Sequence, residues 1–348
     1  MKKAIQTGLA SFGMSGRVFM GPLLGASRHF EVSGIMERTK TDSREYFPQA
    51  KIYRDFNGLC QDPDLELVIV NTPDHLHYEM AGQALECGKH VVVEKPFTQT
   101  SEQAEKLIAL AREKGRILTV FHNRRWDSDF LTVRQVLDQG WLGKLVSFES
   151  HFDRFRNYLR ENSWKEDPGT GSGTLYDLGS HLIDQALVLF GKPRMVTADI
   201  RSLREGGRVD DAFDLWLDYP GKKVKLTGSY LVKEQGPRYI LHGQQGSFLK
   251  WGTDPQEEAL GSGKKPGGKA WGKENRKHWG LLHTTVDGKA IRERLPGAHG
   301  NYPFFFDNLF KAIRLNEPLA VPPEEAALVV RIIEAAYESE ETKKSVPL

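Results

Sequence analysis

The sequence contains only two cysteines, Cys60 and Cys87, among its 348 residues. Two thiols cannot build a disulfide framework or a four-thiolate zinc site, and both lie in stretches that read as helix or as the flank of one. A reducing compartment suits such a chain, so we expect a cytoplasmic protein.

Long apolar runs are also missing. The first apolar run follows two lysines but is interrupted by Gln6, Thr7 and Ser11, and it is shorter than the apolar region of a signal peptide. No segment reaches the roughly 18 consecutive apolar residues that a membrane span needs. The sequence therefore predicts neither a secretory leader nor a membrane partner.

The sequence has no extended block of charge of one sign. Its 48 basic and 46 acidic residues leave a formal net charge of +2 and are spread along the chain. Nucleic-acid binding requires clustered positive charge, so we expect no nucleic-acid partner. The length exceeds the size at which one hydrophobic core keeps growing, and two domains are the natural expectation.

The first part of the chain alternates short apolar runs with helical patterns, which is typical of a parallel sheet with crossover helices. We therefore predict a dinucleotide-binding α/β Rossmann domain, a doubly wound parallel sheet, over residues 1–123. Its expected strands are residues 4–10, 32–36, 67–71, 90–93 and 117–121, and its expected helices are 16–26, 58–62, 77–87 and 101–114.

After His122 the strand-like stretches follow one another directly, which favours an open, mostly antiparallel sheet with helices on one face. We predict an α+β domain over residues 124–348 that binds substrate and forms oligomers. Residues 252–280 are expected to be a long surface loop or a rim that contacts substrate or another subunit. The expected strands are residues 145–155, 195–201, 212–217, 224–230 and 238–242, and the expected helices include 175–190 and 323–339.

A glycine-containing turn follows the first expected strand and opens a helix, which is the context of a dinucleotide-binding turn. Ser11 stands where the first glycine of G-x-G-x-x-G belongs, while Gly13 and Gly16 occupy the positions for close approach to a pyrophosphate and for helix packing. The helix N-terminus can bind phosphates through its N–H groups. We assign Ser11, Phe12, Gly13, Met14 and Gly16 to the cofactor site.

The end of the second strand bears on the choice between NAD and NADP. It carries Glu37, whose carboxylate would accept hydrogen bonds from the ribose hydroxyls. Arg38 and Lys40 follow and would instead pair with a 2′-phosphate. Because a carboxylate repels a phosphate, these residue types favour NAD, and NADP remains the alternative.

Two further strands end in candidate cofactor residues at the carboxyl edge of the sheet, where ligands bind. Lys95, within Glu94-Lys95-Pro96, is a candidate proton handler because a nearby positive nicotinamide would lower its pKa, and the alternative is a solvated charge. His75 and His77 have the spacing of a metal pair but no further ligands nearby, so we predict no metal site. We assign Thr72, Pro73, His77, Glu94 and Lys95 to cofactor binding.

The strongest chemical pattern lies in the expected helix over residues 175–190. Asp177, His181 and Asp184 follow at spacings of four and three and would form one polar stripe opposite the leucines. Histidine titrates near neutrality and can accept a hydroxyl proton as a hydride leaves the same carbon. We predict Lys95, Asp177 and His181 as catalytic, with an exposed acid–histidine pair as the alternative.

Substrate contacts are expected from two stretches around the start of the second domain. One is the arginine-rich run at the end of the fifth strand, and the other precedes the Asp177 helix; their side chains could bind hydroxyls or stack on a ring face. The candidates are Asn123, Arg124, Trp126, Arg154, Arg156 and Trp164, together with Asp177 and His181.

In order and spacing, the glycine turn, Glu94-Lys95-Pro96 and Asp177-x-x-x-His181 resemble the glucose–fructose oxidoreductase and inositol dehydrogenase (Gfo/Idh/MocA) family of NAD(P) enzymes. The runs 121–127, 173–181 and 236–239 look most like its bacterial NADP-dependent scyllo-inositol dehydrogenase branch. The resemblance implies proton transfer by Lys95 and His181, a cyclic polyol or sugar substrate, and a homodimer or homotetramer formed through the second sheet.

Two departures from the family pattern concern the cofactor: Ser11 replaces a glycine, and Glu37 is acidic where an NADP branch favours hydroxyl and basic residues. The leading hypothesis is an NAD(P)-dependent dehydrogenase acting on CH–OH groups of a polyol. The alternatives are a non-catalytic dinucleotide-responsive regulator and a dehydrogenase of the same fold acting on another sugar or a glycoside.

Overall fold

The computed structural model describes residues 3–161, 163–169 and 171–348, and the chain divides into two compact units. Unit 1 runs to Asn123 and also includes Gln256–Trp271 and Asn301–Ala327. Unit 2 comprises Arg124–Pro255, Gly272–Gly300 and Leu328–Leu348. The first crossing between the units falls at residue 123, and two later segments of the chain return to unit 1.

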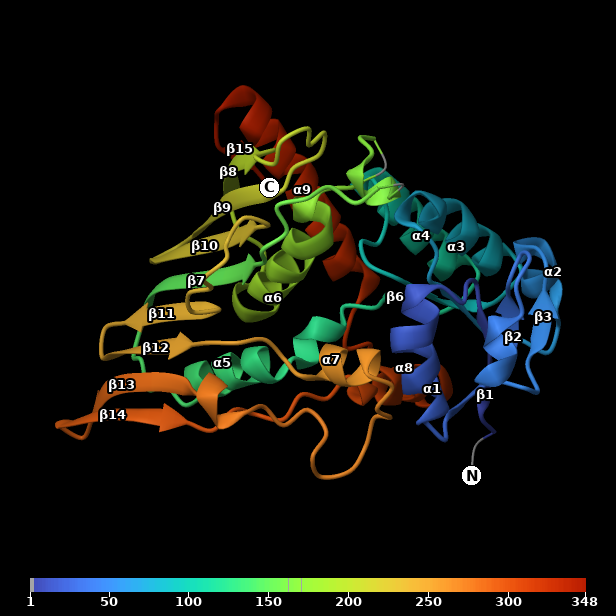
Figure 1. The fold of residues 1–348 in the computed structure, drawn as a ribbon, viewed down its shortest axis with the longest axis horizontal. Helices are drawn as coiled ribbons and strands as arrows, with labels where there is room; N and C mark the ends of the chain where they lie inside the picture. The colour runs from blue at the N-terminus through green and yellow to red at the C-terminus, as the bar shows by residue number, and fades with distance from the viewer. Residues whose placement is uncertain (1–2, 162, 170) are drawn as a thin grey trace. The chain divides into compact units, whose positions relative to one another are not determined.

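Unit 1 is built on a parallel sheet whose order over the described residues is β3-β2-β1-β4-β5-β6. This confirms the predicted doubly wound fold. Its strands β1, β2, β3 and β6 are labelled in Figure 1. The order reverses between β1 and β4, the switch point at which such sheets bind dinucleotides. The strands are β1 (Ile5–Leu9), β2 (Phe30–Met36), β3 (Lys51–Tyr53), β4 (Leu67–Val70), β5 (His90–Val93) and β6 (Leu118–Val120).

The segments that return to unit 1 pack against its first strands and helices. Phe306 and Phe310 of α8 (Pro303–Leu315) lie edge-on to Phe30 of β2, with ring centroids 5.6 and 6.5 Å from that of Phe30. The buried Gln256 side chain accepts hydrogen bonds from the Trp271 indole and the Tyr302 backbone. The stretch 252–280 is therefore not a uniform surface loop, because its middle part, Gln256–Trp271, belongs to the packed body of unit 1.

The helices of unit 1 follow the strands, as the sequence pattern predicts. Those that cross between strands present apolar faces to the sheet, for example Leu107 and Ile108 of α4. They are η1 (Gly16–Met20), α1 (Gly21–Gly25), η2 (Asp42–Glu45), α2 (Phe56–Gln61), η3 (Asp74–Leu76), α3 (His77–Glu86), α4 (Ser101–Glu113), α7 (Gln256–Gly261) and α8 (Pro303–Leu315).

Unit 2 contains an open sheet with the order β14-β13-β12-β11-β7-β10-β9-β8-β15 over the described residues. Only the β7–β10 pair in this part of the chain is parallel, so the mostly antiparallel sheet is confirmed. The strands are β7 (Leu145–Asp153), β8 (Met195–Arg201), β9 (Ala212–Tyr219), β10 (Lys222–Ser229), β11 (Tyr239–Gly243), β12 (Gly246–Lys250), β13 (Gly280–Val286), β14 (Lys289–Leu295) and β15 (Val346–Pro347).

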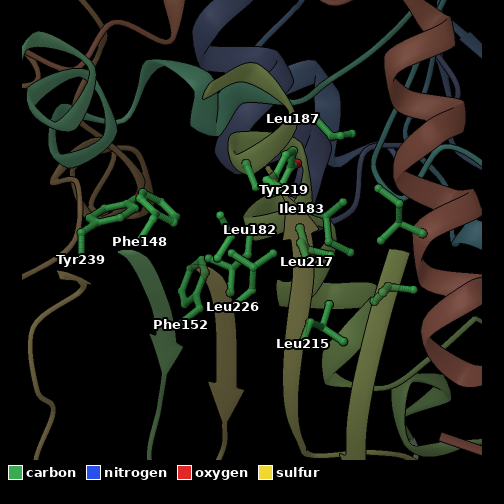
Figure 2. Close-up of a cluster of buried hydrophobic side chains, with 14 of the residues drawn as sticks. Phe148, Phe152, Leu182, Ile183, Leu187, Leu215, Leu217, Tyr219, Leu226 and Tyr239 are labelled. Atoms are coloured by element: carbon green, nitrogen blue, oxygen red, sulfur yellow. The ribbon is translucent and has the colours of Figure 1, made fainter. Parts of the chain in front are cut away.

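One face of this sheet is covered by helices, and Figure 2 shows the core that forms between them. Phe148 and Phe152 of β7 point into it, while Glu149 and His151 alternate onto the opposite, open face. Each buried large apolar side chain contributes about 1.5–3 kcal/mol. The helices of unit 2 are α5 (Ser128–Asp138), α6 (Ser180–Phe190) and the part of α9 (Pro323–Thr342) from Leu328 onward, with short turns η4 (Asn123–Trp126, which begins in unit 1), η5 (Trp164–Glu166), η6 (Leu175–Gly179) and η7 (Arg276–His278).

Candidate active site

The dinucleotide turn of unit 1 is held by one asparagine at the end of β4. The Asn71 amide oxygen accepts from the Ser11 backbone N–H at 3.0 Å, and its amide nitrogen donates to the Ser11 carbonyl at 2.9 Å. The Ser11 hydroxyl donates to the Asn71 carbonyl at 3.0 Å. These three bonds fix a turn that lacks its first glycine, because the Ser11 side chain itself takes part in them.

The two glycines of the turn fulfil different requirements. A Cβ on Gly16 would lie 2.7 Å from the Ser11 carbonyl oxygen, so the helix starts too close to the turn for any side chain there. At Gly13 a Cβ would meet only the Ser11 hydroxyl at 3.8 Å, and the backbone is open to a ligand. The neighbouring Met14 side chain is 62% exposed. The turn therefore fits a pyrophosphate bound at the helix N-terminus.

Glu94 joins this turn to the loop after β5. One carboxylate oxygen accepts from the Ser15 hydroxyl at 2.6 Å, and the other accepts from the Lys95 backbone N–H at 3.0 Å. The half-buried Lys95 side chain begins directly beside this junction. Glu94 thus sets the position of the Lys95 backbone relative to the dinucleotide turn.

The predicted residues after β4 occupy different depths. Thr72 and Pro73 are half-buried, whereas His77 is fully buried and both of its ring nitrogens face backbone carbonyls. No cluster of histidine, cysteine, aspartate or glutamate suited to a metal ion occurs in the part of the chain that the structure describes.

The Glu37 side chain turns inward at the end of β2. It is 8% exposed, and one carboxylate oxygen accepts hydrogen bonds from the Ser43 hydroxyl and from the Ser43 backbone N–H. Arg54 donates to the carbonyls of Glu37 and Lys40 and so fixes the connecting loop. The Arg38 side chain on that loop is exposed. The carboxylate is thus already engaged, and the basic side chain faces solvent.

The helix predicted over residues 175–190 begins in unit 2 with the π-helical turn η6, which continues into α6. The half-buried Asp210 caps it: the Leu175 N–H donates to the Asp210 carboxylate at 2.8 Å, and the Thr174 N–H donates to the Asp210 carbonyl at 2.9 Å. The Tyr337 hydroxyl holds the other carboxylate oxygen at 2.6 Å. Burial raises the pKa of Asp210.

Asp177 lies in the π-helical turn between two polar partners. The Lys165 ammonium is 3.3 Å from one of its carboxylate oxygens, and the Tyr230 hydroxyl donates to the other at 3.4 Å. Burial raises the pKa of Tyr230, and the Asp177 charge adds to that rise. Asp177 is therefore held in place while a hydroxyl group and an ammonium group lie next to it.

His181 is 5% exposed and lies beside Phe152, with ring centroids 6.4 Å apart. Three guanidinium groups surround the same phenyl ring at 4.4 to 5.2 Å from its centroid, those of Arg124, Arg154 and Arg238. Cation–π contacts of this kind fix guanidinium groups against a ring face. The phenyl ring that borders His181 is thus itself in contact with three positively charged groups.

Not all members of the predicted polar stripe face the same way. Asp184 is 2% exposed and receives three hydrogen bonds of 2.6 to 3.1 Å from the buried Arg125 guanidinium. A carboxylate paired in this way is a structural anchor of α6. Asp184 is therefore paired with an arginine, whereas Asp177 has an ammonium group and a hydroxyl group beside it.

The remaining predicted substrate residues are distributed as follows. Asn123 and Trp126 are buried, at 5% and 8% exposure, and Arg124 pairs with Asp127 at 3.3 Å. The half-buried Arg156 lies over the Tyr230 ring at 5.3 Å. The Trp164 side chain lies outside the part of the chain that the structure describes.

Sequence reasoning missed several residues around Asp177 and His181. Lys165, Asp210 and Tyr230 contact or cap the helix from three other segments, and Arg238 and Phe152 border His181. Of these residues, Arg238 lies in the run 236–239, which only the family resemblance had marked. No local pattern marks the others, because each contact joins residues that are distant along the chain.

The features of the two units define a class of protein. A Rossmann sheet with a dinucleotide-type turn, and a second unit that carries an acid–histidine pair on one helix, are those of a nicotinamide-dependent oxidoreductase. Residues 5–122 match the family model described as an oxidoreductase family, NAD-binding Rossmann fold, and residues 134–348 match its C-terminal alpha/beta domain. The chain belongs to the Gfo/Idh/MocA oxidoreductase family, which confirms the resemblance seen in the motifs.

Individual relatives agree with this assignment. The chain is 41% identical over 344 residues to scyllo-inositol 2-dehydrogenase (NADP(+)) IolW of Bacillus subtilis, covering 99% of this chain and 96% of that protein. It is 42% identical over 340 residues to the oxidoreductase YdgJ of Escherichia coli, covering 97% of each. A crystal structure of an oxidoreductase from Bacteroides fragilis superposes with a TM-score of 0.92 at 50% identity, covering 99% of this chain and 100% of that one.

The protein is therefore an NAD(P)-dependent dehydrogenase acting on CH–OH groups, as the sequence predicted. Within the described residues, no helix is both long enough and apolar enough to cross a membrane.

Proposed function

We propose that this enzyme transfers a hydride between a nicotinamide cofactor and a ring carbon of a cyclic polyol or sugar, with an inositol and its ketone as the leading pair. The observation that carries the proposal is the Asp177–His181 pair on one helix, with Tyr230 and Lys165 at the carboxylate. The printed name of the Bacillus subtilis relative supports the inositol assignment.

Each catalytic group has a distinct role in this proposal. His181 accepts the hydroxyl proton as the carbon is oxidised and returns it in the reverse direction. Asp177 accepts a hydrogen bond from a substrate hydroxyl and orients the ring. Lys95 donates to the reacting oxygen and stabilises its developing negative charge. The cofactor, when bound, supplies or receives the hydride.

The test is a substrate screen. The purified protein is given NAD or NADP with inositols, aldoses and sugar acids, and the absorbance of the reduced cofactor is followed. We expect turnover of at least one inositol. Dinucleotide binding without turnover on any inositol or sugar would reject this substrate class.

We further propose that NADP is the preferred cofactor, which reverses the preference for NAD drawn from residue types alone. One oxygen of the Glu37 carboxylate accepts two hydrogen bonds from Ser43, and the side chain is 8% exposed. The Arg38 side chain, on a loop fixed by Arg54, is exposed to solvent and suits a 2′-phosphate. The relative named as NADP(+)-dependent supports the same choice.

Replacing Arg38 with alanine is expected to raise KM for NADP about tenfold and to leave KM for NAD nearly unchanged, because a charge-assisted hydrogen bond contributes about 1.5–3 kcal/mol. Steady-state kinetics with both cofactors measures the effect. The matched control is Arg28→Ala, which removes an exposed arginine just before β2. Equal losses with NAD and NADP would contradict the assignment.

We also propose that subunits associate through the open face of the sheet in unit 2. This face carries Trp216 at 44% exposure and charges of both signs, including Glu149, Lys223 and Lys225, around one groove. A face with both charges and an exposed aromatic ring is suited to pairing with itself.

The two free thiols are in keeping with a cytoplasmic location, which we propose as well.

Substitution of Trp216 by glutamate is expected to convert the assembly to monomers, since it places a charge at the centre of the proposed interface. Light scattering would then report the chain mass of 39.3 kDa, whereas the unmodified protein should show two or four times that value, as expected for a dimer or tetramer. Leu203→Glu, at a 56% exposed leucine off the sheet, is the control. A monomeric unmodified protein would overturn this proposal.

A further inference from the structure

His77 connects the two loops that carry candidate cofactor residues. Its ring is 0% exposed, its Nδ1 lies 2.8 Å from the Pro96 carbonyl oxygen, and its Nε2 lies 3.0 Å from the Thr72 carbonyl oxygen. Pro96 lies in the loop after β5 and Thr72 in the loop after β4. One buried ring therefore spans both loops of unit 1.

The two contacts have a defined chemical requirement. A carbonyl oxygen only accepts, so the doubly protonated ring donates to both carbonyls, whereas a neutral ring donates to one of them and packs against the other. Burial lowers the pKa of His77, and the carbonyls of Pro96 and Thr72 oppose that change. Unpaired carbonyls in a dry interior are costly, so the ring is the natural partner for both loops.

The loops joined by His77 are those that hold the cofactor end of the site. Pro96 directly follows Lys95, whose backbone N–H is bound by Glu94. Thr72 directly follows Asn71, which makes three hydrogen bonds with Ser11 in the dinucleotide turn. With 0% exposure, the His77 ring is not a surface that a cofactor can touch.

We propose that His77 is a positioning residue that fixes the Lys95 loop against the dinucleotide-binding loop. Its Nδ1 contact fixes the backbone position from which the Lys95 side chain extends. Its Nε2 contact fixes the position of the loop that continues from Asn71. This inference rests on the proposed role of Lys95 in the reaction. It assigns to His77 a backbone-binding role in place of the direct cofactor contact expected from the sequence.

Two substitutions separate the two contacts. The amide nitrogen of asparagine lies near the position of Nδ1, so His77→Asn is designed to keep the bond to Pro96 and lose the one to Thr72. The amide nitrogen of glutamine lies near Nε2, so His77→Gln is designed to keep the bond to Thr72 and lose the one to Pro96. Each substitution removes one of the two polar contacts, and about 1 kcal/mol, or roughly fivefold in an equilibrium, is the scale of such a buried contact.

The expected result is a split between the kinetic constants. His77→Gln should lower kcat about five- to tenfold with the Kd for reduced cofactor nearly unchanged, and His77→Asn should raise that Kd about fivefold with kcat nearly unchanged. Fluorescence titration of NADPH gives Kd without turnover. The exposed His75, changed to asparagine and glutamine, is the matched control.

A purely structural role would lower kcat and raise Kd together in both variants, in proportion to the loss of thermal stability, and that result overturns the inference. So does an unchanged pair of constants. Hydrogen exchange of the unmodified enzyme, measured with and without NADPH, gives a second test that does not depend on a variant folding. The peptides around 72–77 and 94–97 should gain protection together when NADPH binds. Protection of only one of the two peptides also overturns the inference. If the unmodified enzyme turned over no polyol or sugar, the proposed function would fail, while the Kd and exchange results would still test the coupling.

Discussion

Replacing His181 with alanine is expected to lower kcat by about 10²- to 10⁴-fold, the usual contribution of a general base. The reason is that the substitution removes the imidazole that accepts the hydroxyl proton. The Kd for the cofactor should change little, because His181 belongs to unit 2 and the dinucleotide turn to unit 1. Stopped-flow or steady-state absorbance of the reduced cofactor measures kcat, and fluorescence titration measures Kd.

Lys95→Ala belongs to the same prediction. It should reduce kcat by about 10²-fold, since it removes the donor to the reacting oxygen. The controls remove the same residue types from exposed positions: His299→Ala in unit 2 and Lys106→Ala in unit 1. A purified His181→Ala or Lys95→Ala enzyme with unmodified turnover on every accepted polyol would remove these residues from the proposed mechanism.

Gly173→Ala should destabilise the protein strongly. Gly173 has φ +102°, and a Cβ there would overlap the Asp210 carboxylate. That carboxylate cannot swing aside at low cost, because Leu175 and Tyr337 both donate to it. Backbone strain of about 1–3 kcal/mol adds to a packing penalty of about 1–3 kcal/mol.

The expected result is therefore a loss of about 2–6 kcal/mol in the free energy of unfolding, a large share of the 5–15 kcal/mol of a typical domain. Activity should fall as well, because Asp177 lies four residues along the displaced helix. Denaturant unfolding and kcat together measure the effect. Gly191→Ala, at φ +72° and ψ −160° with nothing within 4 Å of the new Cβ, is the control at the other end of the same helix and should cost only the backbone strain, about 1–3 kcal/mol. Equal losses at the two glycines would show that the Asp210 contact is unimportant.

The sequence predicted well wherever a short segment determines its own structure. Central parallel strands are buried on both sides, so β4 and β5 appear as continuous apolar runs and were placed to within a residue. The short edge strand β3 has no such run and was missed. The strands β12 to β14 were missed for a related reason, since glycine-rich and charged sequence surrounds them and their pairing, not their composition, defines them.

The candidate site shows the same division. Lys95, Asp177 and His181 stand out because their types, spacing and places at a strand end or on a helix are local properties. Tyr230 and Lys165 do not, because they meet Asp177 only when segments 53 and 12 residues away fold beside it.

Two interpretations drawn from residue types changed once the neighbours were visible. Asp184 stands on the same helix as His181 at helical spacing, yet its carboxylate is taken up by Arg125 from 59 residues away. Glu37 has the type and position of a ribose ligand, yet Ser43 holds it inward.

The sequence by itself determined the doubly wound and open-sheet architecture, the dinucleotide turn and the catalytic candidates of this dehydrogenase. Local apolar periodicity, turn residues and motif spacing are set by neighbours along the chain. Only the tertiary structure decided which carboxylates are already paired, which histidine is buried between backbone carbonyls, and that Asp210 caps the helix of Asp177. The partners in those contacts come from distant segments, and the availability of a charged or titratable group depends on what the fold places next to it.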